Sequence, residues 1–369
     1  MKTKYIALSA LCIASLSFTA CSEDESDILP EAPDYERQEQ PTKGAYILTL
    51  EGKVDDGTTE GEYANMVYVD LNEEKQIPID RTSWHLSFYS GKESRVTLNQ
   101  SFTRAYSTGM TDFATVTLED IKTAVADQKF PDLAGGMMNY PREQVINDTS
   151  DGDLNTTVFG DLSTDPAKSE VFLMASEALD VSRWIKVKIT ALGDAYHIAY
   201  CNISENNPKE ATVQKDEKMQ FIPFSLHTGK IVELPAKWDL MWSYSIALTT
   251  MPNGKIILGP SSDVVTTNRH GGVQVAIVPV ANPMEIRSEF ENFTAEGVEG
   301  LDFSHNADVL GTDWRLTPMP NAVAPGPKAD RFYVIKDKEG ELFKLRFLHF
   351  CEEDGGERGK PMLEAAPLK

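Results

Sequence analysis

The sequence predicts an all-β fold of mainly antiparallel sheets with a minor helix, and two observations carry this prediction. From Gly44 onward, short runs such as 45–50 and 66–71 alternate apolar and polar residues, which is typical of a half-buried strand. Two longer runs, at 82–98 and 234–248, share one order of residues: tryptophan, a polar residue, leucine, any residue and an aromatic residue. Each run then leads into further β-forming residues.

The repeated tryptophan runs predict two tandem β-rich halves. Later strands match in the same order, and Trp-Ile-Lys-Val-Lys-Ile at 184–189 corresponds to Leu-Phe-Lys-Leu-Arg-Phe at 342–347. The predicted halves are residues 44–206 and 212–369, with a turn-rich linker at 204–211. The alternative is that two similar strand motifs belong to one large β-sheet.

The individual elements follow from the same patterns. The expected strands are 45–50, 66–71, 84–89, 95–98, 171–175, 184–190 and 196–201 in the first half, and 219–226, 238–248, 272–280, 332–336 and 342–350 in the second. A short helix is expected at 116–126, because Thr117 can cap it and Glu119 and Asp120 lie in its first turn.

The first twenty residues have the pattern of a signal peptide. Lys2 and Lys4 supply positive charge, residues 6–16 form an apolar run too short to cross a membrane, and Ala20 precedes Cys21. Small residues before a cysteine at this place indicate lipoprotein processing, with the lipid on Cys21. The alternative is a plain secretory signal, residues 1–20, with an incidental cysteine.

Residues 21–43 are rich in acidic residues and contain several prolines, so they are expected to form a disordered tether. The chain of 369 residues carries a net charge of −22. This charge argues against nucleic acids and anionic membrane surfaces as partners, because all of them are polyanions. We therefore expect membrane attachment by the lipid anchor only.

Cys201 and Cys351 are the two cysteines beyond the leader. They could form one disulfide in an oxidising compartment, or remain as two buried thiols. Two cysteines cannot form a structural zinc site on their own.

The sequence lacks the common catalytic signatures, which favours a binding protein over an enzyme. It contains no Gly-x-Ser-x-Gly elbow, no His-Glu-x-x-His motif and no phosphate loop, and its six histidines are scattered. An enzyme such as a glycan hydrolase would need two carboxylates facing each other across a cleft. Exposed loop aromatics such as Trp314 and Tyr140 would instead support a glycan or protein ligand.

A set of segments follows one order along the chain from about Met66. The set comprises 84–88, 95–99 and 109–112 in the first half, then Trp238-Asp239-Leu240, His270-Gly271-Gly272-Val273, the closing segment 331–347 and the tail 356–361. Together with the lipoprotein leader, these segments resemble the HmuY-type haem-binding lipoproteins of Bacteroidetes. The acidic run behind Cys21 also resembles the surface-export signal of lipoproteins from this group.

The resemblance implies a mainly antiparallel β-fold and a non-enzymatic role in haem capture. Members of the family take haem from host haemoproteins outside the cell and pass it to an outer-membrane receptor of the TonB-dependent kind. The resemblance therefore implies a lipid-anchored protein exposed at the surface of the outer membrane. In members of the family, two axial side chains hold the iron, which are histidines in some and methionines in others.

Two methionines of the second half are the expected iron ligands. Met319 lies between Pro318 and Pro320, just before the closing strands, and its position resembles that of one axial ligand in the family. Met284 precedes it at close to the spacing of the family's other ligand. A thioether is a soft, neutral ligand that suits haem iron.

Other residues are alternatives to these ligands. His305 could replace Met284, and His270 is a further candidate. In the first half, Met137-Met138 follows two glycines, whereas the counterpart of Met319 falls near Phe159, which cannot bind iron. The second half is therefore expected to hold haem, although a methionine often only fills a gap in a core.

Overall fold

The computed structural model describes residues 40–54, 63–119, 138–139, 148–176, 181–250, 256–317 and 325–368. These residues form mainly antiparallel sheets with a short α-helix, α2 (Ile286–Asn292), which confirms the all-β prediction. Cys21, the signal peptide and nearly all of the expected tether lie outside the described residues. Most of the predicted helix at 116–126 does so as well, although Leu118 and Glu119 are helical.

The described strands group into two β-sandwiches. The first sandwich contains β4 (Leu86–Tyr89), β5 (Val96–Leu98), β6 (Thr103–Ser107), β8 (Val171–Ser176), β9 (Ile185–Leu192), β10 (Ala195–Asn202), β11 (Lys209–Gln214), β12 (Phe221–Ser225) and β13 (Lys230–Ile231). The second sandwich contains β1 (Tyr46–Thr49), β2 (Asn65–Asp70), β3 (Lys75–Asp80), β7 (Met138–Asn139), β14 (Leu240–Thr250), β15 (Ile256–Thr267), β16 (Gln274–Pro279), β19 (Arg331–Lys336), β20 (Leu342–His349) and β21 (Met362–Pro367).

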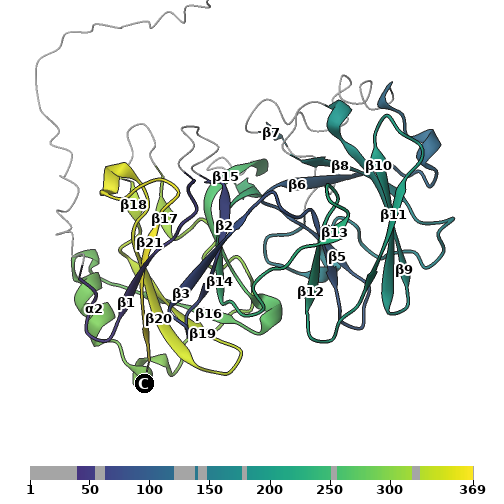
Figure 1. Ribbon diagram of the computed structural model, residues 1–369. Helices are drawn as coiled ribbons and strands as arrows, with labels where there is room; N and C mark the ends of the chain where they lie inside the picture. Colours follow the sequence, from purple (N-terminus) through teal and green to yellow (C-terminus); the bar gives the residue numbers. More distant parts are fainter. Residues whose placement is uncertain are drawn as a thin grey trace, which may run out of the picture. The chain divides into compact units, whose positions relative to one another are not determined.

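Each sandwich consists of two sheets. In the first, the sheet orders are β11-β10-β9-β8-β6 and β13-β12-β4-β5. In the second, they are β1-β21-β20-β19-β16 and β3-β2-β14-β15-β7 (Figure 1). A separate ladder joins β17 (Arg315–Leu316) to β18 (Gly326–Pro327).

A separate apolar core lies between the two sheets of each sandwich. The first core includes Leu86, Phe88, Phe172, Val187, Ile198 and Phe224. The second includes Val67, Val69, Leu240, Trp242, Ile335, Leu345 and Phe347. Burying one such side chain contributes roughly 1.5–3 kcal/mol relative to leaving it in water. Phe290 of α2 covers the outer face of the second sandwich by packing on Phe332 and Val334.

The sandwiches do not follow the predicted boundary, because each contains strands from both predicted halves. Near the start of the chain, β1 pairs with β21 and β2 pairs with β14. Beyond residue 208, β11 pairs with β10 and β12 pairs with β4. In addition, β11 begins at Lys209, so the predicted linker at 204–211 is too long at its C-terminal end.

The polar residue of each tryptophan run binds a hairpin from the other predicted half. In the first sandwich, His85 Nδ1 accepts a hydrogen bond of 3.2 Å from the backbone N–H of Leu226, directly after β12. In the second, Asp239 Oδ2 accepts one of 2.8 Å from the backbone N–H of Leu71, directly after β2. Because Nδ1 of His85 is an acceptor, its neutral ring carries the proton on Nε2.

These two anchors give the sandwiches opposite pH dependences. Burial raises the pKa of Asp239 to about 6, against the effect of its bond to Leu71. The folded chain therefore holds this proton more tightly than the unfolded chain, and stability rises as the pH falls through about 6. Burial, with a contribution from His227, lowers the pKa of His85 to about 3. The contribution of His85 is therefore complete above its usual pKa of 6.5 and is lost as the pH falls toward 3.

Asparagine at either anchor position keeps an acceptor but cannot titrate. We expect Asp239→Asn to raise the free energy of unfolding by about 2 kcal/mol at pH 8 and by about half as much at pH 5, and to change it little below pH 4. We expect His85→Asn to reduce the loss of stability between pH 6 and pH 4. Urea denaturation at a series of pH values between 4 and 8 measures both effects. Variants whose pH profiles run parallel to that of the wild type would contradict this account of the anchors.

Candidate functional site

The structure describes only one of the two predicted iron ligands, Met284. It lies in the 3₁₀ turn η6 (Pro283–Glu285), directly before α2, and its side chain is 64 % exposed. The Asn282 side chain caps this turn by accepting a hydrogen bond of 3.2 Å from the backbone N–H of Met284, and Pro283 fixes the first position. Met319 and its flanking prolines lie outside the described residues.

The described residues just before segment 318–324, which carries Met319, lie near β16. This strand forms one edge of its sheet, and Met284 follows it in the chain. The paired strands β17 and β18 flank this segment. Just before β17, Asp313 Oδ2 is 2.7 Å from Nη1 of Arg331, the first residue of β19. Arg331 in turn lies opposite Pro279, the last residue of β16, shortly before Met284. The described residues just before segment 318–324 therefore lie at the end of β16 that leads to Met284.

His305, the alternative to Met284, lies at the other end of β16. Its ring is exposed, and its Nε2 atom is 2.5 Å from Nε2 of Gln274, the first residue of that strand. At about 3.3 Å per residue, the six residues of β16 separate the two ends by roughly 15 Å. His305 therefore lies at the end of β16 opposite to the one that leads to Met284.

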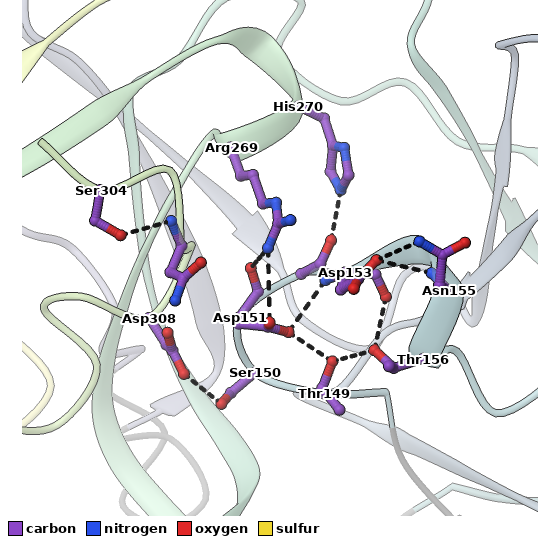
Figure 2. A network of polar contacts seen from close by, with 12 residues as sticks. Thr149, Ser150, Asp151, Asp153, Asn155, Thr156, Arg269, His270, Ser304 and Asp308 are labelled. Atoms are coloured by element: carbon purple, nitrogen blue, oxygen red, sulfur yellow. Dashed lines mark hydrogen bonds and ion pairs between the residues drawn. The ribbon is translucent and has the colours of Figure 1, made fainter.

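His270, the other histidine candidate, belongs to a polar network that joins the loop at 148–156 to the turn after β15. Its Nε2 atom lies 2.8 Å from the carbonyl oxygen of Gly152, and Figure 2 shows the ring directed toward the loop that carries Asp153. Beside it, Arg269 Nη1 donates to the carbonyl oxygen of Asp151 at 2.7 Å. Burial lowers the pKa of His270. A neutral ring in contact with the backbone indicates a structural role for His270.

The same network contains several carboxylates, but they do not form a metal centre. Ser150 Oγ donates to Asp308 Oδ2 at 2.6 Å, and Asp153 accepts from the backbone N–H of Asn155 at 2.9 Å (Figure 2). Nowhere in the described part of the chain do three or more His, Cys, Asp or Glu side chains form a group that could hold a metal ion.

A buried charged cluster near β17 is not predicted by the sequence. Asp263 is fully buried, and its Oδ2 atom lies 3.6 Å from Nε of Arg315 and 3.8 Å from Nη1 of Arg358. Burial raises the pKa of Asp263, although both arginines oppose the shift. Arg315 Nη2 also donates to the carbonyl oxygen of Ser262. This cluster therefore fixes the strand from which segment 318–324 begins.

No sequence signal marks this cluster, because its three charged residues lie far apart along the chain. In the structure, the backbone of Asp263 is unusual, because its φ angle of 57° places it in the left-handed region. A non-glycine residue in this region is uncommon and depends on its surroundings to hold it there.

Trp314, one of the two aromatic residues suggested for a glycan or protein ligand, does not lie on the surface. Trp314 is only 1 % exposed, and its ring stacks on Phe347 with 4.0 Å between centroids. The expectation that Trp314 is an exposed loop aromatic is therefore wrong, because this side chain fills the second core. Tyr140 lies outside the described residues.

The sequence predicts the counterpart of Met319 in the first half near Phe159, which lies in the core of the first sandwich. Phe159 is buried, and its ring lies 4.7 Å from that of Phe172 between centroids. Met138 lies in β7, which pairs with β15 of the second sandwich and not with a strand of the first, and Met137 is outside the described residues. A surface hollow of about 460 Å³ elsewhere in this sandwich is lined by Lys215, Met219 and Ile231 and contains none of the predicted ligands.

The two cysteines of the folded part are separate, buried and free. Cys201 Sγ is 3.3 Å from the carbonyl oxygen of Glu205, and Cys351 caps a short 3₁₀ turn, η8 (Glu352–Asp354). Burial raises the pKa of both thiols, which keeps them in the unreactive protonated form.

Comparison with known proteins assigns the family. The profile of the HmuY protein family matches residues 62–364, which span both sandwiches. No curated protein and no solved structure matches the chain. Within the described ranges, no helix has the length and apolar character needed to cross a membrane. The match covers most of the 369 residues, and the chain therefore belongs to the HmuY family.

Proposed function

We propose that the chain is a cell-surface lipoprotein that binds haem and catalyses no reaction. The observation that carries this proposal is the family match over residues 62–364, because HmuY proteins are a haem-binding family. In this proposal, the lipid on Cys21 and the tether at 21–43 hold the protein at the outer face of the outer membrane. Haem comes from host haemoproteins and passes to a TonB-dependent receptor.

In the proposed site, Met284 and Met319 hold the iron from its two sides. Three observations support this assignment. The Met284 side chain is exposed and lies on a capped, proline-stiffened turn. Asp313, which lies shortly before segment 318–324, forms an ion pair with Arg331 at the end of β16 that leads to Met284. Leu316, at the base of that segment, is 39 % exposed and offers an apolar surface for a flat ring.

The second sandwich is the proposed binding half. In the first sandwich, the sequence predicts the counterpart of Met319 near Phe159, whose ring is buried and offers no ligand atom. We therefore expect one haem per chain.

Replacing Met284 by alanine tests the site. We expect Met284→Ala to weaken haemin binding at least tenfold, equivalent to about 1.4 kcal/mol, because one axial bond is lost. Absorbance titration of residues 22–369 measures the affinity. Met110→Ala is the matched control, since Met110 is 41 % exposed but belongs to the first sandwich, and it should leave the affinity unchanged. Equal affinities for both variants would rule out Met284 as a ligand.

A further inference from the structure

The two sandwiches are built from the same nine strands in the same order. The sheet β11-β10-β9-β8-β6 corresponds to β1-β21-β20-β19-β16, and β13-β12-β4-β5 corresponds to β3-β2-β14-β15. Along the chain, one series runs from β1 to β10 and the other from β11 to β21, with β7, β17 and β18 as the only additions among the described strands. In each series, the first three strands lie in the sandwich that contains the last six strands of the other series.

Specific hydrogen bonds recur at corresponding positions. Asn99 Nδ2 donates to the carbonyl oxygen of Trp84 at 2.9 Å, and Asn268 Nδ2 donates to that of Trp238 at 3.0 Å. The backbone N–H group of Asn99 donates to the carbonyl oxygen of His85 at 3.0 Å, and that of Asn268 donates to the carbonyl oxygen of Asp239 at 2.9 Å. His85 and Asp239 are also the two hairpin anchors, so the whole arrangement around each tryptophan run occurs twice.

Two buried lysines repeat the pattern on the outer faces. Lys186 of β9 donates to the carbonyl oxygens of Phe113 at 2.9 Å and Val116 at 3.3 Å. Lys344 of β20 donates to the carbonyl oxygens at the end of α2, including that of Phe290 at 2.5 Å. The two lysines occupy matching positions in the segments 184–189 and 342–347. Such agreement in register and in bonding is characteristic of a repeat.

One apolar cluster joins two of the exchanged strands, β2 and β3, to residues next to β4 and β14. It contains the first tryptophan of each repeated run, together with side chains of β2, β3, β14 and the connection before β14: Met66, Tyr68, Ile77, Ile79, Trp84, Val232, Leu234, Trp238 and Met241. Without the other series, β4 and β14 would each lose a paired neighbour, and both cores would lose buried side chains such as Ile222 and Val69. Unpaired backbone groups and exposed cores are strongly unfavourable.

We propose that the chain is a fused pair of equivalent units that complete each other by reciprocal exchange of their first three strands. Residues 44–206 and 209–369 are then mutual binding partners, and the connection between β10 and β11 is dispensable for their association. The partner that each unit recognises is a second copy of the same nine-strand unit.

Cutting the connection in the otherwise intact chain tests this proposal. A site-specific protease sequence is inserted between Asn207 and Pro208, which leaves the bond from Lys186 Nζ to Asn206 Oδ1 in place. After cleavage, we expect both pieces to elute as one particle in a 1:1 ratio with unchanged far-ultraviolet circular dichroism. In urea, the pieces should separate only in the transition in which the sheet signal is lost. Separation in buffer into two folded pieces would overturn the proposal.

Two controls make the result interpretable. The same protease sequence between Gln40 and Pro41 should release the N-terminal segment after cleavage, which shows that the assay detects separation. If the first insertion lowers the melting temperature before cleavage, the insertion is moved to the exposed turn between Glu217 and Lys218. A cut there leaves β12 and β13 with the second piece, so the same result is expected, and separation of folded pieces would again overturn the proposal.

Discussion

Glu364→Ala is expected to lower the free energy of unfolding by about 3–5 kcal/mol, because it leaves a buried cation without its partner. Glu364 is fully buried in β21, and its Oε2 atom accepts from Nε and Nη2 of Arg346, both at 2.6 Å. Its Oε1 atom accepts from the backbone N–H of Thr42 at 2.5 Å. The carboxylate therefore stabilises both a central strand and the residues that lead into β1. Urea denaturation measures the loss.

Glu357→Ala is the matched control for this prediction. Glu357 also forms ion pairs, at 2.7 Å with Lys53 and 3.1 Å with Lys360, but its side chain is partly exposed. Ion pairs in water contribute about 0–1 kcal/mol, so this variant should remain close to the wild type. A loss of less than about 1 kcal/mol for Glu364→Ala would contradict the role assigned to the buried pair.

Lys344→Met is expected to cost about 2–3 kcal/mol and to weaken haem binding as well. The Nζ atom of Lys344 donates to three carbonyl oxygens at the end of α2, those of Phe290 at 2.5 Å, Glu291 at 2.9 Å and Phe293 at 3.0 Å. Methionine keeps the apolar stem but leaves these carbonyls unpaired. Because α2 begins directly after Met284, loosening the helix should also loosen the proposed ligand turn.

Lys186→Met separates the two effects. It removes the corresponding ammonium from the first sandwich, and we expect a similar loss of stability with unchanged haemin affinity. Urea denaturation and haemin titration of both variants provide the two measurements. An equal loss of haemin affinity in both variants would contradict the assignment of the site to the second sandwich.

The sequence predicted the existence and type of most strands but not their partners. Alternation of apolar and polar residues indicates a strand such as β2, because the side chains on one face are buried while those on the other face meet water or a second layer. Pairing depends on contacts distant in sequence, so nothing local in 66–71 indicates that β2 pairs with β14 rather than β4. The strands at 256–267 and 362–367 were missed for a related reason, since their patterns are interrupted by polar or small residues.

The candidate site was predictable only in part. The proline-flanked methionines indicated a ligand type, and the structure places Met284 on an exposed turn. The buried contact between Asp263 and Arg315 could not be predicted, because the two residues meet only after β15 and β17 come together. Trp314 was predicted to be exposed because it lies outside the expected strands. Its burial depends on packing against residues distant in sequence, which the local pattern does not reveal.

Haemin titration of residues 22–369 and of the Met319→Ala variant tests the central claim most directly. Absorbance is recorded in the oxidised and the reduced state. We predict a saturable shift of the Soret band with one haem per chain in the wild type, and loss of that shift or a change of its position in Met319→Ala. The absence of a saturable shift in either redox state would contradict haem binding by this protein.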